Sequence, residues 1–335
     1  DANMENPEWN LSSFDDNAWE NAREVHSPSP YAQAQPCPLN RIGRRFTPVT
    51  ITDLGQDRHE IDFGTNVSGG FRFRFPPVEK GKTIIFRYAD EKRNTISDKG
   101  SVPEGAREVA AGSYKELVYT GRDGKPNAYQ SFRQYDVYVS SGRPGEIFQT
   151  RFNYHGFRYV VVENLPSAPT RQDAEATLIE SDLESVGSFF CSNELFNRIH
   201  NVNLWTVRCL NLGGYIADCP HRERVGYGDS HVSIETSIMN LWMPAFYQKW
   251  IRDWRDVQDP KTGMVPSSAP QRIGAGGPAL GGALQALTWR QYLYYGDIGV
   301  LEDNYDACRR YLDAIEAHCK GGVLRFIDGV HGKKS

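Results

Sequence analysis

The stretch ADCPHRERVGYGDSH, residues 217–231, concentrates charged and reactive side chains that a protein core does not require. Two arginines, two histidines, a cysteine and a tyrosine lie among three carboxylates: Asp218, Glu223 and Asp229. Clustered carboxylates compete for protons, so burial and like charge raise the pKa of one while a neighbouring guanidinium keeps another ionised. This combination suits a general acid beside charged hydrogen-bonding partners, the pairing that glycoside hydrolysis uses.

Other interpretations of the same loop stay open. The carboxylates and arginines are also compatible with an ion-pair network that ties the loop to neighbouring helix ends. A zinc site would draw on Cys219, His221, Asp229 and His231, but their spacings match no ligand pattern and the adjacent arginines oppose a cation. A Cys219 nucleophile activated by His221 is disfavoured, because residues two apart beside a proline rarely reach hydrogen-bond geometry.

The composition is that of a folded protein, and 335 residues are enough for two domains. The net charge is −4 and the sequence has no long basic run, so the charge pattern does not indicate binding to nucleic acid or to an anionic membrane. A neutral substrate agrees better with this charge. No apolar run reaches the length of a membrane span, and six cysteines without a CxxC pair require no disulfide framework.

The absence of a signal peptide or initiator Met at the start predicts a mature or excised piece. The compartment stays open, with the bacterial periplasm or exterior favoured over the cytoplasm.

The hydrophobic period changes near residue 180. Before it, runs such as GGFRFRFPPV, TIIFRYADE and RQYDVYVSSG alternate with period two and predict an antiparallel β-sandwich. We expect residues 1–45 to be the tail of a preceding β-module and a linker, residues 46–180 the sandwich, and residues 181–335 a helical domain.

About five helices are expected after residue 190. Leu195, Ile199 and Val202 follow an N-cap predicted at Ser192, and a second apolar stripe recurs at Phe246, Trp250 and Trp254. Further helices are expected near 231–241, 281–295 and 299–319. Helices in succession predict a toroid or a bundle of helix pairs, with the acidic loop between the first two.

The acidic segment resembles the signature of the bacterial α-L-rhamnosidases, inverting glycosidases whose catalytic domain is an (α/α)6 barrel. FNYHGFRYVVVENL, FYQKWIRDWRDVQDPKTGMVPSSAP, GAGGPALGG and WRQYLYYGD agree in order, so the resemblance covers about residues 46–319. It implies a hydrolase that releases terminal α-L-rhamnose from glycans or glycosides with inversion and without a cofactor.

The resemblance assigns roles residue by residue. Glu223 matches the general acid, and Asp218 and Arg222 match residues that hold sugar hydroxyls. Tyr227 takes the position of an aromatic, often Trp, that stacks on the sugar. Asp229 matches a further carboxylate, although many family members have one more residue before it.

Two departures from the family pattern matter. Leu280 stands where the family commonly has a Trp, and the family's general base is a Glu on a later helix pair, expected beyond residue 335. Neither Glu235, Glu302 nor Glu316 lies in a matching motif, so no base is assigned. A non-catalytic carbohydrate-binding relative and an (α/α)-barrel glycosidase for another sugar remain alternatives. The aglycone, the linkage and the oligomeric state stay open.

Overall fold

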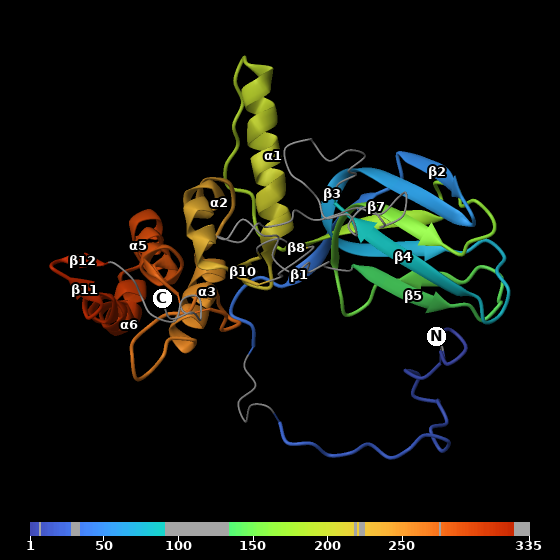
Figure 1. Ribbon diagram of the computed structural model, residues 1–335, viewed down its shortest axis with the longest axis horizontal. Coiled ribbons are helices and arrows are strands. Elements are labelled where there is room, and N and C mark those ends of the chain that lie inside the picture. Colours follow the sequence, from blue (N-terminus) through green and yellow to red (C-terminus); the bar gives the residue numbers. More distant parts are fainter. Residues whose placement is uncertain are drawn as a thin grey trace.

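The computed structural model describes residues 1–6, 8–27, 34–90, 134–217, 220, 225–274 and 276–324. A strand-rich half and a helical half lie side by side along the long axis of the molecule (Figure 1). The eight strands of the large sheet come before residue 182 and the long helices after residue 193, so the change of period in the sequence is a change of architecture.

The sheet half is a single antiparallel sheet of eight strands in the described part of the chain. The central order is β1-β8-β3-β7-β4-β5, and β2 and β6 also pair with β3. The strands are β1 (Asn40–Phe46), β2 (Thr50–Gly55), β3 (Arg58–Arg74), β4 (Thr83–Ala89), β5 (Tyr135–Val139), β6 (Ile147–Gln149), β7 (His155–Glu163) and β8 (Ala174–Ser181).

The long strand β3 explains how one sheet encloses a core. Along one edge β3 pairs with β2 in its first part and with β8 in its last part. Along the other edge it pairs with β7 and then with β6. The pairing register with β7 shifts between Asp62 and Val67, and such a bulge bends a strand and increases its twist. The expected antiparallel sandwich is therefore formed by one curled sheet, in which β3 runs through both layers.

The core of the sheet half follows from the alternation in GGFRFRF. Phe71 and Phe73 of β3 are 1% and 0% exposed, whereas Arg72 between them is half-buried and Arg74 after them is exposed. Their rings pack against Phe86 of β4, with centroids 5.3 Å and 5.5 Å away. Period two along β3 thus separates an aromatic inner face from a charged outer face.

The helical half contains five helices of seven residues or more in its described part. Phe246, Trp250 and Trp254 are all 0% exposed at the centre of its core, so the predicted apolar stripe is confirmed. The helices are α1 (Glu194–Leu210), α2 (Ile234–Asn240), α3 (Pro244–Asp256), α5 (Ala283–Tyr295) and α6 (Ile298–Glu316), with the single turn α4 (Pro278–Gly281) before α5.

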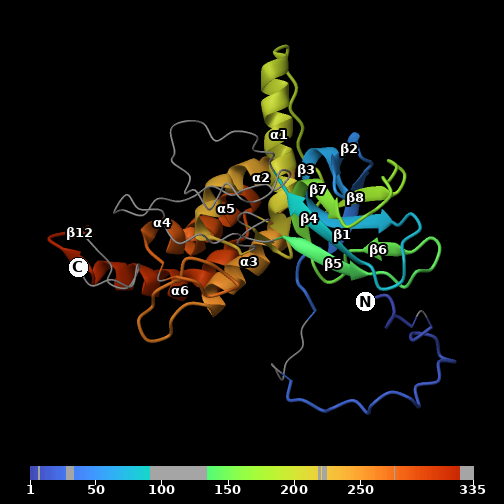
Figure 2. The same cartoon turned by 45° about the vertical axis from the view of Figure 1, so that its right-hand side comes forward.

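Helix α1 projects from the body of the molecule in both views (Figures 1 and 2). Its N-cap is Asn193, whose side chain accepts a hydrogen bond from Leu195 N, so the cap predicted at Ser192 is wrong by one residue. Near its other end, Trp205 Nε1 donates to Asn66 O at 2.8 Å and Arg208 pairs with Glu180 at 2.9 Å. The C-terminal part of α1 is thereby fixed to the sheet.

The first residues of the chain lie against the edge strand β5. Ala2 N donates to Val139 O at 3.0 Å, and the Ala2 side chain is buried. Strand β1 begins at Asn40, inside the segment 1–45 that we expect to be a tail and linker. None of the helices in the described residues is long and apolar enough to cross a membrane.

Candidate active site

A short hairpin follows α1 directly, and the acidic loop begins where this hairpin ends. The hairpin is made of β9 (Asn211–Leu212) and β10 (Tyr215–Ile216), with Gly213 and Gly214 at its turn. Both glycines have positive φ, 68° and 80°, as both central residues of a type I′ turn require. Ala217 N then donates to Leu210 O at 2.8 Å, and Ala217 is 0% exposed. The chain therefore enters the loop from a buried, hydrogen-bonded position.

The far end of the loop is held by a different part of the chain. Val225 is 4% exposed, and the next residues run against the segment 267–269. Ala269 N donates to Gly226 O at 2.9 Å, and Gly228 N donates to Ser267 O at 3.0 Å. These paired hydrogen bonds fix the end of the loop on the helical core.

Glycine is required at position 226 by close approach. A Cβ there would lie 2.4 Å from Ala269 O and 3.0 Å from Trp250 Nε1. Since no side chain fits in that space, the backbone of the loop lies directly on the core tryptophan.

Of the five predicted site residues, the structure describes Tyr227 and Asp229. The predicted acid Glu223 and the predicted sugar-binding residues Asp218 and Arg222 lie outside the described residues, so their roles stay predictions. Within the loop the structure also describes Pro220, which is buried.

Tyr227 and Asp229 lie at the start of a short 3₁₀ helix, η2 (Gly228–Ser233). Tyr227 is half-buried and forms an isolated bridge with Ser268, whereas Asp229 is exposed. A Cβ at Gly228 would lie 1.8 Å from Leu280 O, so η2 packs on α4 at its first residue. The structure thus brings the aromatic Tyr227 beside the turn that carries Leu280, two positions that the sequence analysis named separately.

A metal site gains no support from the described residues. His231 Nδ1 lies 2.6 Å from Gly228 O, and because a carbonyl only accepts, Nδ1 is the donor of this hydrogen bond. The described part of the chain contains no group of three His, Cys, Asp or Glu residues that could hold a metal ion. Cys219 and His221, the remaining members of the considered set, lie outside it.

The three glutamates that were considered as bases are placed on helix surfaces. Glu235 Oε1 accepts from Tyr294 OH at 3.1 Å and lies 3.2 Å from Arg290 Nε. Glu302 and Glu316 are exposed on α6. Glu235 of α2 therefore forms an ion pair with Arg290 of α5.

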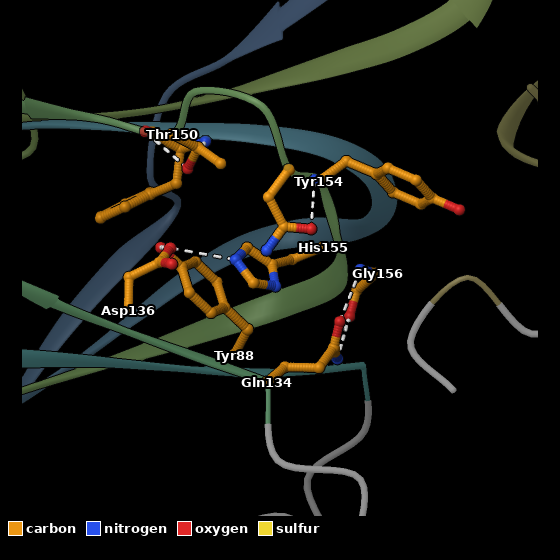
Figure 3. Close-up of polar contacts among 9 residues, drawn as sticks. Tyr88, Gln134, Asp136, Thr150, Tyr154, His155 and Gly156 are labelled. Atoms are coloured by element: carbon orange, nitrogen blue, oxygen red, sulfur yellow. Dashed lines mark hydrogen bonds and ion pairs between the residues drawn. The ribbon is translucent and has the colours of Figure 1, made fainter. Parts of the chain in front are cut away.

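A second polar cluster, which the sequence analysis missed, lies within the sheet half (Figure 3). Tyr88 of β4 stacks on His155 of β7 with ring centroids 3.9 Å apart. Asp136 of β5 accepts from Tyr88 OH at 2.8 Å and lies 3.0 Å from His155 Nε2. Burial, followed by the charge of Asp136 and its hydrogen bond, raises the pKa of Tyr88 well above its usual value, so the phenol stays protonated.

This cluster ties three strands together. His155 is 1% exposed, and beside it the Gln134 amide makes paired hydrogen bonds with the backbone of Gly156 at 2.9 Å and 3.0 Å (Figure 3). Period-two alternation predicts the strands that carry these residues, but no local pattern reveals partners on different strands. We assign the cluster to the structure of the sheet, because Tyr88 OH and His155 Nε2 are both directed at the Asp136 carboxylate.

The structure defines a chain with a curled antiparallel sheet followed by a helical half, and comparisons with known proteins give its class. Residues 52–180 match the model of the bacterial alpha-L-rhamnosidase concanavalin-like domain. Residues 184–329 match that of the bacterial alpha-L-rhamnosidase 6 hairpin glycosidase domain. The chain belongs to the bacterial α-L-rhamnosidase family, as its motifs indicated.

Individual relatives carry the same name. An alpha-L-rhamnosidase of Formosa agariphila is 29% identical over 91% of this chain. The solved alpha-L-rhamnosidase of Dictyoglumus thermophilum matches 97% of the chain with a TM-score of 0.80 and 31% identity. That of Streptomyces avermitilis, solved in complex with L-rhamnose, matches 96% with a TM-score of 0.77 and 26% identity. The chain spans about a third of the length of these proteins, namely 31%, 34% and 29%.

Proposed function

We propose that this chain is part of an α-L-rhamnosidase that hydrolyses terminal α-L-rhamnose from glycans or glycosides with inversion. One observation carries the proposal: the acidic loop lies within the match to the glycosidase domain and has both ends held in the core of that domain. The relative crystallised with L-rhamnose supports the choice of sugar.

In the proposed reaction, Glu223 gives its proton to the glycosidic oxygen as the bond from C1 to that oxygen breaks. A water adds to C1 from the opposite face and loses its proton to a general base, so the configuration inverts. Asp218 accepts from and Arg222 donates to sugar hydroxyls, Tyr227 contacts the apolar face, and Asp229 adds a further carboxylate. No cofactor takes part.

The general base is proposed to lie outside residues 1–335. The glutamates considered within the described part are placed on helix surfaces, and the relatives are about three times as long as this chain. The inverting geometry needs two carboxyl groups roughly 6.5–9.5 Å apart with a water between them.

The test is hydrolysis by the complete protein. Wild type should cleave aryl and alkyl α-L-rhamnosides, and NMR should show the β-anomer of rhamnose as the first product. Glu223→Gln should lower kcat on an alkyl rhamnoside by ~10²–10⁴-fold while rhamnose still binds, because an amide keeps the shape but has no proton to give. Binding without hydrolysis by wild type would instead indicate a carbohydrate-binding relative, and cleavage of other aryl glycosides only would indicate a different sugar.

A further inference from the structure

The segment that leads into β1 lies where the two halves of the molecule meet (Figure 1). Residues 35–40 run directly into the sheet, yet Cys37 among them is 7% exposed and lies against the helical half. We propose that residues 35–40 are a strap that fixes the sheet half and the helical half in one relative orientation. The strap does not include the acidic loop, and its role is independent of the proposed reaction.

On the helical side, Cys37 lies beside the turn of the hairpin β9–β10 and helix α3. A Cβ at Gly214 would lie 2.6 Å from Cys37 Sγ and 2.8 Å from Lys249 Cδ. Lys249 is itself held, because its ammonium lies 2.6 Å from the carboxylate of Asp253 on the same helix. The turn is therefore enclosed between the strap and α3.

The strap has a defined shape of its own. Gln35 Nε2 donates to Pro38 O at 3.2 Å and lies 3.2 Å from Cys37 Sγ. Pro36 and Pro38 flank Cys37, and a proline fixes its own φ and restricts the residue before it. Only three residues separate Cys37 from Asn40, a span of at most about 11 Å. The contact with the helical half is thus tied closely to the first strand.

On the sheet side, the strap becomes the edge strand β1. Asn40 pairs with Ser181 of β8, and Asp182 N donates to Leu39 O at 3.0 Å. Asn40 Oδ1 also accepts from Gly213 N at 2.9 Å. One side chain at the edge of the sheet therefore binds the turn of the hairpin.

The hairpin in turn belongs to the helical half. Asn211 N donates to Val207 O of α1, and Ile216 is 3% exposed within the helical core. Ser181 Oγ lies 3.1 Å from Asn211 O, where both residues are buried, so the sheet holds the hairpin at its base as well as at its turn.

The strap adds a second attachment between the halves. The first is the end of α1, where Trp205 bonds Asn66 and Arg208 pairs with Glu180. Domains joined by a small interface move relative to one another by default, and an attachment at one helix end permits rotation about it. A further attachment at the hairpin turn and α3 removes that freedom.

The test adds one methyl group at the turn. Gly214→Ala has to displace the strap, whereas a Cβ at Gly213 has its nearest neighbour 3.6 Å away. Both glycines have positive φ, 80° and 68°, so Gly213→Ala carries the same backbone strain and is the matched control. Combining Gly214→Ala with Cys37→Ala removes the sulfur and returns the space to the strap.

Double electron–electron resonance measures the relative orientation of the halves in the complete protein. Spin labels are attached to p-acetylphenylalanine at positions 152 and 312, because Phe152 of the sheet half and Leu312 of α6 are exposed. Wild type and Gly213→Ala should give the same narrow distance distribution. Gly214→Ala should give a broader or shifted one, and the variant that also carries Cys37→Ala should return toward wild type.

A milder variant removes a hydrogen bond without adding an atom. In Asn40→Ala the Gly213 amide loses its acceptor, so hydrogen exchange of peptide 211–216 should be about five- to tenfold faster at that amide. The distance distribution should broaden as well. Asn40→Asp, which keeps an oxygen acceptor, should restore both measurements.

An unchanged distance distribution in Gly214→Ala and Asn40→Ala would overturn the role of the strap, and so would equal broadening in Gly213→Ala. If Gly214→Ala does not fold, the two Asn40 variants decide the question by the same distance measurement. None of these measurements reads hydrolysis, so failure of the strap leaves the proposed function intact.

Discussion

Phe71 in the sheet half and Phe196 in the helical half both lie on regular elements, but Phe71 is 1% exposed and Phe196 is 54% exposed. The sheet half encloses its aromatic residues because the long strand β3 carries the sheet around them. Helix α1 carries an apolar face that the described part of the chain leaves uncovered near its N-terminal end. Leu195, Ile199 and Val202 on that face are 60%, 47% and 64% exposed.

The uncovered faces lie on the outer members of the helical set. Tyr305 and Leu312 of α6 are 67% and 58% exposed, whereas Trp250 and Trp254 of α3, between them, are fully buried. A helix inside a toroid packs against neighbours on both sides. Among the described residues α3 is covered in this way, whereas α1 and α6 each keep one apolar face exposed. The difference teaches that, among the described residues, the sheet half closes its aromatic core, whereas α1 and α6 of the helical half keep apolar side chains exposed.

The largest test of this difference separates the two halves. Residues 34–182 alone should give a monomer that unfolds cooperatively in urea, whereas residues 183–335 alone should bind a hydrophobic dye and lack a cooperative transition. Loss of about 400 Å² of apolar contact costs on the order of 10 kcal/mol, which is comparable with the stability of a domain. If the helical fragment is monomeric and unfolds cooperatively, the exposed apolar faces do not destabilise it and the comparison is wrong.

A smaller test compares the two phenylalanines within the whole chain. Phe71→Ala should lower the free energy of unfolding by ~3–5 kcal/mol, because it leaves a cavity in a closed core. Phe196→Ala should change it by less than about 0.5 kcal/mol, as for other exposed positions. Both effects are measured by urea unfolding, followed by hydrogen exchange of peptides from β3 and α1. Similar effects of the two substitutions would contradict the comparison.

The smallest test uses two carboxylates whose pKa values shift in opposite directions. In the sheet half, burial alone would raise the pKa of Glu146, but hydrogen bonds from Ser141, Ser140 and the Arg143 amide outweigh it and lower the pKa. In the helical half, burial raises the pKa of Asp253, and the Lys249 ammonium 2.6 Å away offsets only part of this.

The two shifts give opposite dependences on pH. Glu146 stabilises the sheet half above the ordinary carboxyl pKa, and this contribution is lost as the pH falls through its lowered value. Asp253 binds a proton more readily in the folded state, so its contribution to helical stability rises as the pH falls through its raised value. Hydrogen exchange of peptides 135–149 and 244–256, corrected for intrinsic rates, measures both. Glu146→Gln and Asp253→Asn should each flatten only their own profile, and a change in the other half's profile would contradict the assignment.

The sequence predicted the elements well where the deciding pattern is local. Alternation in GGFRFRF and the spacing of Phe246, Trp250 and Trp254 each select one face of one element, and both faces are buried. The helix start was misplaced by one residue because Ser192 and Asn193 are both good caps. Whether the face of α1 is covered depends on a neighbour, which its own pattern does not specify.

The candidate site was less predictable from residue chemistry alone. Clustered carboxylates suggested an acid but left an ion-pair network open, and only the ordered motifs of a family pointed to Glu223. The contacts of Ser181 with Asn211 and of Tyr88 with Asp136 join residues 30 and 48 positions apart, so no spacing rule finds them. Those contacts are the ones that support the loop and the sheet.

The pairing of β1 with β8 also sets an order of events during synthesis. Asn40 cannot pair with Ser181 until the ribosome has made the 141 residues that separate them, and only then does the sheet gain its edge strand. At ~5–20 residues per second a ribosome needs on the order of ten seconds for that stretch, and local pairs such as β2 with β3 form long before it ends. The edge of the sheet therefore closes just as the first helix is being made, and the sheet contacts of the hairpin β9–β10 become available immediately before the acidic loop is made.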